Sequence, residues 1–420
     1  MKIENIKIKN FKNLKSININ NIGDINIIVG RNNTGKTSLL QAIMLAEYPE
    51  YFPIDYINRY HLNSIDNLIN YSSKSSTIEI TVNKPVDNRL HIEINRPKIG
   101  ESIEVITEAL KQNLKKNLNY ALKTGIKRSG KEIKKPLQDE EIDVSINNYI
   151  QENMETIVNN IHKDIVIKGR YYFSIEMIEL MENIMQQIME KYKISSTFRI
   201  LPGNVWGEVA YLPFRNSYRV LPFTKNKEMR SFNNKDIILI NPKIRIQDLN
   251  NNETLSLKIE NLIKENGILP DMERFSFKNL VFNVDGEFKE VPFQLMGEGF
   301  QVLISLISQI LSCQNKRTKP VILIEEPEVH MHPGYIDEFV NYVMSFYINN
   351  NVQFFISTHS DDFINGFLNN DLKPEIKSKI EKGFRVFRLN EIEGENLVET
   401  LDYKEAIENL DELSLDLRGL

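Results

Sequence analysis

The order of apolar and polar residues predicts strands and helices at both ends of the chain. In residues 2–8 isoleucines alternate with polar residues, which is the period-two pattern of a half-buried strand. Residues 25–29 form a short apolar run that stops at Gly30, and apolar residues at helical spacing follow it. Residues 77–83 and 89–96 alternate on either side of a Lys-Pro-Val-Asp-Asn turn, so we expect an antiparallel hairpin there.

The pattern changes in the middle of the chain, where glycine is sparse and apolar residues recur at helical spacing. Four methionines in this region lie four residues apart: Met177, Met181, Met185 and Met189. Because flexible Met side chains fill irregular gaps, we interpret this stripe as the core face of a helix. The alternative is a groove for a second copy or a partner. We therefore predict a mostly helical insertion over residues 100–204, between two parts of one head, residues 1–99 and 205–420.

Strand patterns return after the insertion. The predicted strands are residues 208–212, 237–240, 280–283, 321–325, 352–357 and 385–388. Apolar helices lie between several of them, and this alternation is typical of an α/β fold with a largely parallel sheet.

The segment Gly-Arg-Asn-Asn-Thr-Gly-Lys-Thr at residues 30–37 follows a predicted strand and opens a predicted helix. Its G-x4-G-K-T spacing is that of a P-loop, whose backbone N–H groups converge on phosphate oxygens at a helix N-terminus. Lys36 can reach the β- and γ-phosphates of a nucleotide, and Thr37 can bind Mg²⁺. The predicted ATP-binding residues are Gly30, Asn32, Asn33, Thr34, Gly35, Lys36, Thr37 and Ser38.

Two adjacent carboxylates, Glu325 and Glu326, end the apolar strand 321–325. Ligands of open α/β sheets bind at the carboxyl ends of strands. Phosphoryl transfer needs one carboxylate near the metal and a group that orients or deprotonates the attacking water. We expect Glu325 to be a metal ligand together with Thr37, and Glu326 to be the catalytic base. Without a P-loop in the same chain, such a pair would more often be a solvated strand end.

Two weaker signals complete the candidate site. His359 follows the apolar strand 352–357, where a neutral imidazole could hydrogen-bond a γ-phosphate or the attacking water, although alone it would more often be a structural histidine. Gly297, Glu298 and Gly299 precede a predicted apolar helix and could form an anion site or only a tight turn.

Together these motifs resemble the ATP-binding-cassette (ABC) class of ATPases, in the OLD-like branch with the AAA_15 and AAA_21 families. Residues 6–12 (Ile-Lys-Ile-Lys-Asn-Phe-Lys) and the P-loop are similar to the first lobe of that branch. Residues 325–333 (Glu-Glu-Pro-Glu-Val-His-Met-His-Pro) are similar to its Walker B motif and D-loop. His359 stands where the branch has its switch histidine. Residues 211–215 and 416–418 also resemble family segments.

The resemblance implies an ABC-type P-loop NTPase head, with a mixed, largely parallel sheet, an antiparallel β lobe, and ATP and Mg²⁺ as ligands. Two copies, as a homodimer or part of a higher oligomer, would enclose two ATP molecules. Each P-loop would face Gly297, Glu298 and Gly299 of the other copy. Met296 stands in place of the signature serine, so this contact in trans would rest on the glycine backbone and the helix dipole.

The same resemblance bears on partners. OLD nucleases have a nuclease domain after the ATPase, and the stretch beyond His359 is short for one. We therefore expect a separate effector chain, a nuclease, as in the stand-alone ATPase subunits of PARIS- or Septu-type phage-defence systems.

Composition adds one further candidate surface. The formal net charge is −5, yet residues 111–135 contain nine Lys or Arg residues against a single Glu. This stretch is either a solvated helix face or a site for DNA or an acidic protein. The single cysteine, Cys313, excludes an intrachain disulfide, and no apolar run is long enough for a membrane span, so we expect a cytoplasmic protein.

The sequence thus predicts a Mg-dependent ATPase whose nucleotide state controls assembly with an effector in antiviral defence. One alternative is a RecF- or SMC-like DNA-repair ATPase that clamps DNA directly. Another is a scaffold that binds ATP without hydrolysing it.

Overall fold

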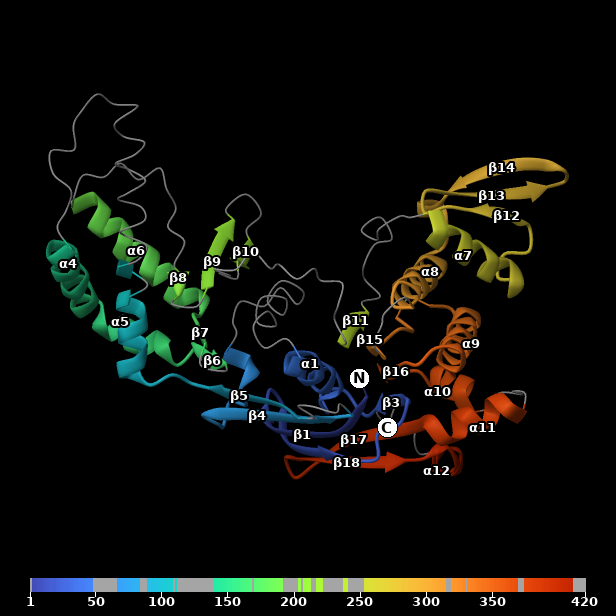
Figure 1. Cartoon of the computed structure of the whole chain (residues 1–420), viewed down its shortest axis with the longest axis horizontal. Helices are drawn as coiled ribbons and strands as arrows, with labels where there is room; N and C mark the ends of the chain where they lie inside the picture. The colour runs from blue at the N-terminus through green and yellow to red at the C-terminus, as the bar shows by residue number, and fades with distance from the viewer. Residues whose placement is uncertain are drawn as a thin grey trace.

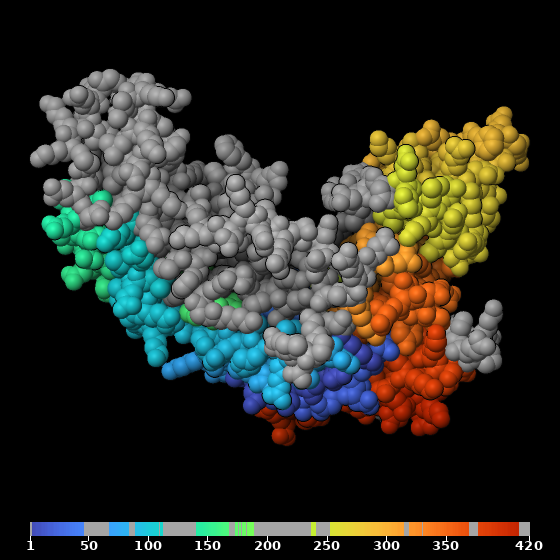
Figure 2. Space-filling model, viewed as in Figure 1, coloured from blue at the N-terminus to red at the C-terminus, as the bar shows by residue number. Residues whose placement is uncertain are grey.

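The computed structural model places two six-stranded sheets at the base of the molecule, with helical units rising on either side (Figure 1). The space-filling view shows the N-terminal strands at this base and the C-terminal part along one side (Figure 2). The structure describes residues 2–47, 66–83, 89–108, 110–111, 139–167, 170–191, 203–204, 207–212, 217–221, 237–240, 253–314, 319–329, 331–368 and 374–410.

One six-stranded sheet is mostly parallel. In spatial order its strands are β11 (Ile237–Ile240), β15 (Val321–Glu325), β16 (Gln353–Ser357), β3 (Ile25–Val29), β17 (Phe384–Ile392) and β18 (Glu395–Leu401). Only β18 runs antiparallel to its neighbour. The residues of β3 and β16 are buried throughout, as expected of central parallel strands covered on both faces.

Helices cover one face of this sheet. They are α8 (Glu298–Leu311), α9 (Pro333–Asn349), α10 (Asp361–Leu368), α11 (Pro374–Gly383) and α12 (Tyr403–Glu408). The inward side chains of α8, α9 and α10 pack with Ile25, Ile27 and Val29 in one apolar cluster. The opposite face packs against α1 (Lys36–Glu47) and the second sheet.

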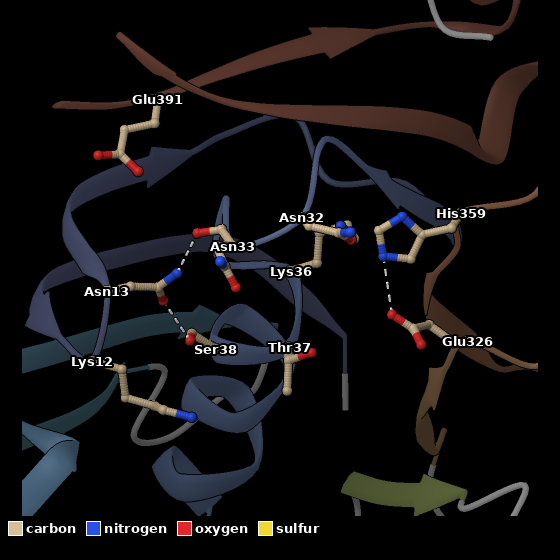
Figure 3. Close-up of a pocket in the computed structure, with 11 residues that line it drawn as sticks. Lys12, Asn13, Asn32, Asn33, Lys36, Thr37, Ser38, Glu326, His359 and Glu391 are labelled. Atoms are coloured by element: carbon tan, nitrogen blue, oxygen red, sulfur yellow. Dashed lines mark hydrogen bonds and ion pairs between the residues drawn. The ribbon is translucent and has the colours of Figure 1, made fainter. Parts of the chain in front are cut away.

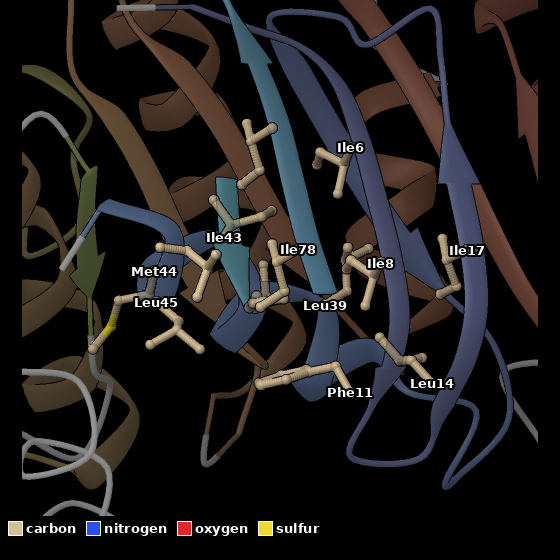
Figure 4. Close-up of a cluster of buried hydrophobic side chains, with 14 of the residues drawn as sticks. Ile6, Ile8, Phe11, Leu14, Ile17, Leu39, Ile43, Met44, Leu45 and Ile78 are labelled. Carbon is tan, nitrogen blue, oxygen red and sulfur yellow. The ribbon is translucent and has the colours of Figure 1, made fainter. Parts of the chain in front are cut away.

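The second six-stranded sheet is entirely antiparallel. In spatial order its strands are β2 (Leu14–Ile19), β1 (Ile3–Phe11), β4 (Ser75–Val82), β5 (Arg89–Asn95), β6 (Ile165–Ile167) and β7 (Arg170–Tyr172). The predicted hairpin is confirmed, because β4 and β5 pair with Ile78 opposite Ile92. Isoleucines of these strands and the apolar face of α1 share one core, as Figure 4 shows for Ile8, Leu39 and Ile43. The two sheets together confirm the predicted α/β class with an antiparallel lobe.

The described part of the insertion includes the helices α4 (Asp139–Glu152), α5 (Met154–Ile161) and α6 (Ile175–Lys191). Met177, Met181 and Met185 are buried in a cluster that these helices share, so this part of the stripe is core. The side chain of Met189 lies outside the described residues. β6 and β7 were not expected here, because three-residue strands are too short to show a period-two pattern. They extend the sheet of the head through the pairing of β5 with β6.

Two smaller sheets lie apart from these. Their strands are β12 (Met272–Phe275), β13 (Asn279–Val284) and β14 (Glu287–Pro292) in one, and β8 (Gly203–Asn204), β9 (Gly207–Leu212) and β10 (Ser217–Leu221) in the other. The β12–β14 sheet and α7 (Glu253–Glu265) pack against α8 through Phe300 and Ile304. Within the described ranges, no helix combines the length and apolarity needed to cross a bilayer.

Candidate nucleotide-binding site

The P-loop joins the end of β3 to α1, and its two glycines have conformations that other residues rarely adopt. Gly30 has φ +145° and Gly35 has φ +104°. A Cβ on Gly30 would lie 2.3 Å from the carbonyl oxygen of Leu389, and one on Gly35 would lie 2.1 Å from Cδ2 of Leu14. Both positions therefore require glycine, because strain and close packing act together.

Lys36 lies across this loop. Its Nζ donates hydrogen bonds to the carbonyl oxygens of Gly30, at 2.8 Å, and Arg31, at 3.0 Å. Burial lowers the pKa of Lys36 to about 8, while the charges of Glu326 and Glu328 act in the opposite direction. A phosphate at this position would favour the charged amine, because an opposite charge offsets the desolvation.

Thr37 and Glu325 meet at the end of β15. The Thr37 hydroxyl donates a hydrogen bond to Oε1 of Glu325, with the two oxygens 2.5 Å apart. Mg²⁺ prefers oxygen ligands such as hydroxyl and carboxylate groups. The donor set therefore fits the metal site expected from the sequence.

Glu326 and His359 form a second pair, one residue beyond β15 and two beyond β16. Nε2 of His359 lies 3.1 Å from Oε1 of Glu326. Burial and the nearby charge of Lys36 lower the pKa of His359, and Glu326 raises it. The lowered pKa favours a neutral imidazole at neutral pH. Glu326 has φ +43°, and its N–H donates to the carbonyl oxygen of Ser357 at 2.9 Å, which fixes this unusual conformation.

Lys36, Thr37, Glu326 and His359 border one open cavity of about 760 Å³ (Figure 3). The lining residues are Lys12, Asn13, Asn32, Asn33, Gly35, Lys36, Thr37, Ser38, Glu326, His359 and Glu391. The structure thus brings most of the sequence-predicted P-loop residues together with Glu326 and His359. The predicted residues Gly30, Thr34 and Glu325 do not border this cavity.

Three lining residues were missed by the sequence analysis. Lys12 and Asn13 form the turn between β1 and β2. Asn13 donates to the carbonyl oxygen of Asn33 at 2.6 Å and accepts from the Ser38 hydroxyl at 2.7 Å. Burial lowers the pKa of Lys12 to about 8. A polar turn directly after the first alternating strand was the available signal.

Glu391 is the third missed residue, and it comes from the end of β17. Figure 3 shows Glu391 and Asn13 at one end of the cavity, and His359 with Glu326 at the other. The position of Glu391 follows from the parallel pairing of β17 with β3, which no local pattern encodes.

The predicted signature residues lie elsewhere. Gly297 is the N-cap of α8, and Glu298 begins the helix. Gly299 lies inside the first turn of α8, so the expectation that both glycines precede the helix was wrong, because the helix begins three residues earlier than the apolar pattern. Among the described residues, none of these three borders the cavity.

Other predicted features fall partly outside the described residues. In the basic stretch only Lys111 belongs to the described part, and its Nζ lies 2.7 Å from Oδ2 of Asp143 on α4. Residues 112–138 lie outside it, as do the side chains of residues 211–215 and residues 416–418.

Residues 25–365 match the AAA_21 family, described as "AAA domain, putative AbiEii toxin, Type IV TA system". The chain belongs to this family. It is therefore an ATPase of the AAA/ABC P-loop class, as the motifs predicted.

The chain is also similar to several individual proteins. An "ATP/GTP phosphatase" of Helicobacter pylori is 23% identical over 379 residues, which cover 86% of each protein. The DNA replication and repair protein RecF of Francisella tularensis subsp. novicida is 33% identical over 82 residues, which cover 20% of this chain and 24% of RecF. The SMC head domain from Thermotoga maritima aligns with 96% of this chain and 100% of its own, with a TM-score of 0.41 and 10% identity.

Proposed function

We propose that this chain binds ATP with Mg²⁺ and hydrolyses it, and that the bound nucleotide controls assembly with a second copy and an effector chain. The observation that supports this best is the grouping of Lys36, Thr37 and the Glu326–His359 pair around one cavity, with Glu325 hydrogen-bonded to Thr37.

Phosphate binding follows from the P-loop and its lysine. The Lys36 amine exchanges its two carbonyl acceptors for β- and γ-phosphate oxygens. Thr37 and Glu325 hold Mg²⁺, directly or through its water shell. Bound Mg²⁺ supplies positive charge that offsets the charge on the transferred phosphoryl group.

Hydrolysis follows from the second pair. Glu326 takes the proton from the attacking water, a task for which a carboxylate at the cavity wall is suited. Neutral His359 donates from Nε2 to Oε1 of Glu326, which holds the carboxylate in one orientation.

We assign the contact between copies to the N-terminus of α8. The N-terminus of α8, with Gly297, Glu298 and Gly299, meets the γ-phosphate bound by a second copy, through backbone N–H groups and the helix dipole. The effector is a separate nuclease chain and the setting is antiviral defence, in the manner of PARIS- or Septu-type ATPase subunits. The family description, which refers to a toxin–antitoxin system, supports a multi-component setting.

A DNA clamp is the second candidate, because the chain shares 33% identity with RecF over 82 residues. The two differ in salt dependence, since DNA held by many phosphate contacts is released steeply as salt rises.

The direct test of the proposed function is phosphate release by the purified chain with ATP, in Mg²⁺ and in excess EDTA. We expect turnover only with Mg²⁺. If the chain binds ATP tightly but does not hydrolyse it, either alone or with the effector, the result would instead support a non-hydrolysing scaffold.

A further inference from the structure

Glu328 lies two residues beyond Glu326 and does not border the cavity, yet it contacts the loop that holds His359. Its Oε1 accepts from the Thr358 hydroxyl at 2.8 Å and from the His359 backbone N–H at 2.6 Å. Thr358 is fully buried, and its hydroxyl also accepts from the N–H of Ser360 at 3.0 Å. One carboxylate oxygen therefore fixes the start of the loop beyond β16.

His359 is consequently held at two points by a single short segment. Glu326 contacts its imidazole, and Glu328 contacts its backbone. Pro327 between them limits backbone freedom, and the left-handed conformation of Glu326 directs the two carboxylates to different parts of the same residue.

The other oxygen of Glu328 shows that this arrangement is not optimal for stability. Oε2 is buried and has no hydrogen-bond partner among the described residues. Burial raises the pKa of Glu328, which is a sign of the desolvation that its charged form experiences. Burying an unsatisfied carboxylate oxygen destabilises the folded state. Glu328 thus fixes the position of the loop that carries His359, and it lowers the stability of the folded state in doing so.

We propose that Glu328 is a positioning residue for ATP hydrolysis, which holds the backbone of His359 in register with Glu326. This inference rests on the proposed function. Glu328 acts by accepting hydrogen bonds and not through its charge, because the charges that shift the pKa of His359 are those of Lys36 and Glu326.

The experiment compares kcat, KM for ATP and Tm in Glu328→Ala, Glu328→Gln, His359→Ala and the double variant Glu328→Ala/His359→Ala. Glu328→Ala should lower kcat about 10-fold or more, with KM within about twofold, since the phosphate-binding groups are untouched. Glu328→Gln retains an acceptor oxygen, so its kcat should stay within about threefold of wild type. Its Tm should equal or exceed that of wild type, since a neutral amide is easier to bury than a carboxylate.

The double variant separates positioning from a general structural role. If Glu328 acts through His359, removing both should slow turnover no more than about twofold beyond His359→Ala alone. If Glu328→Ala does not fold, Glu328→Asp replaces it, because the shorter side chain retains the charge but cannot reach the His359 N–H.

Three results would overturn the inference. Wild-type kcat in Glu328→Ala would do so, as would losses that multiply in the double variant, or a Tm fall in Glu328→Gln that accompanies its loss of kcat. In each case slow turnover by His359→Ala leaves the proposed function standing. A wild-type chain without turnover would overturn both proposals together.

Discussion

The P-loop cavity and the N-terminus of α8 are both expected to contact ATP, but they are built in different ways. The cavity is assembled from segments far apart in the sequence, and buried central strands support it from behind. The α8 end is open in the described part of the chain: Leu295 just before it is 75% exposed, and a Cβ on Gly297 would have no described atom within 4 Å. One chain thus groups the candidate phosphate-binding residues around a single cavity, whereas the residues expected to contact ATP in trans lie at an open helix end.

Removing the lysine of the cavity should give the largest effect. We expect Lys36→Ala to weaken ATP binding about 100-fold or more, because it removes the charge that faces the β- and γ-phosphates. Isothermal titration calorimetry measures this. Lys12→Ala is the matched control, as a second, partly buried lysine of the same cavity, and should weaken ATP binding only about 10-fold. Equal affinities of wild type and Lys36→Ala would refute the P-loop assignment.

The next effect concerns the base. Glu326→Gln should slow hydrolysis about 10²- to 10³-fold while ATP affinity stays within about threefold, because the amide has the same shape but cannot accept the proton. Glu391→Gln alters the other carboxylate of the cavity lining and should change turnover less than about twofold. Single-turnover phosphate release compares the two. A normal rate in Glu326→Gln would move the base to Glu325 or His359.

The cavity should also respond to pH. Lys36 and Lys12 have pKa values of about 8 in the structure, so both lose charge as pH rises through 8. Bound phosphate favours their charged forms, and ATP affinity should therefore be highest below pH 8 and fall about 10-fold or more by pH 9. Titrations at pH 7, 8 and 9 test this. The Lys12→Arg variant stays charged, so its ATP affinity should decline less steeply with pH than that of wild type. If the two proteins show the same dependence of affinity on pH, Lys12 does not take part in ATP binding.

At the open end of α8 we expect a smaller effect. Met296→Ser should strengthen ATP-dependent self-association about 3- to 10-fold, because it adds a hydroxyl next to the expected γ-phosphate contact. Light scattering in the Glu326→Gln background measures association without turnover, and ATP affinity at low protein concentration serves as the control. Unchanged association would mean that this end does not face ATP.

The smallest effect on hydrolysis is expected from the insertion. The substitutions are Lys127, Arg128, Lys131, Lys134 and Lys135, all to Glu. Turnover should stay within about twofold, because the expected catalytic groups belong to the flanking parts of the chain. Binding to DNA or to an acidic partner should be lost, as a filter-binding or pull-down assay would show. A collapse of hydrolysis would make the insertion part of the active assembly.

Local spacing explains why parts of the site could be predicted. The P-loop is specified by glycines and a lysine within eight residues. Glu326 and His359 each follow an apolar strand in the sequence, and the parallel pairing of β15 with β16 brings the two residues together. Glu391 and Lys12 could not be predicted in the same way. Their positions depend on strand order and on the β1–β2 turn, which are set by tertiary packing. The strands β6 and β7 were missed because they are too short for periodicity.

The pairing of β5 with β6 has a mechanical consequence. Two residue pairs, with Ile94 opposite Ile167 and Asn95 opposite Val166, join the insertion to the sheet of the head. A force applied to the insertion would therefore act on the hydrogen bonds between β5 and β6, and the insertion would not swing freely about a hinge. The sheet continues through β4 to β1, whose turn places Lys12 and Asn13 at the cavity. A partner pulling on the insertion would in this way pull on one wall of the nucleotide site.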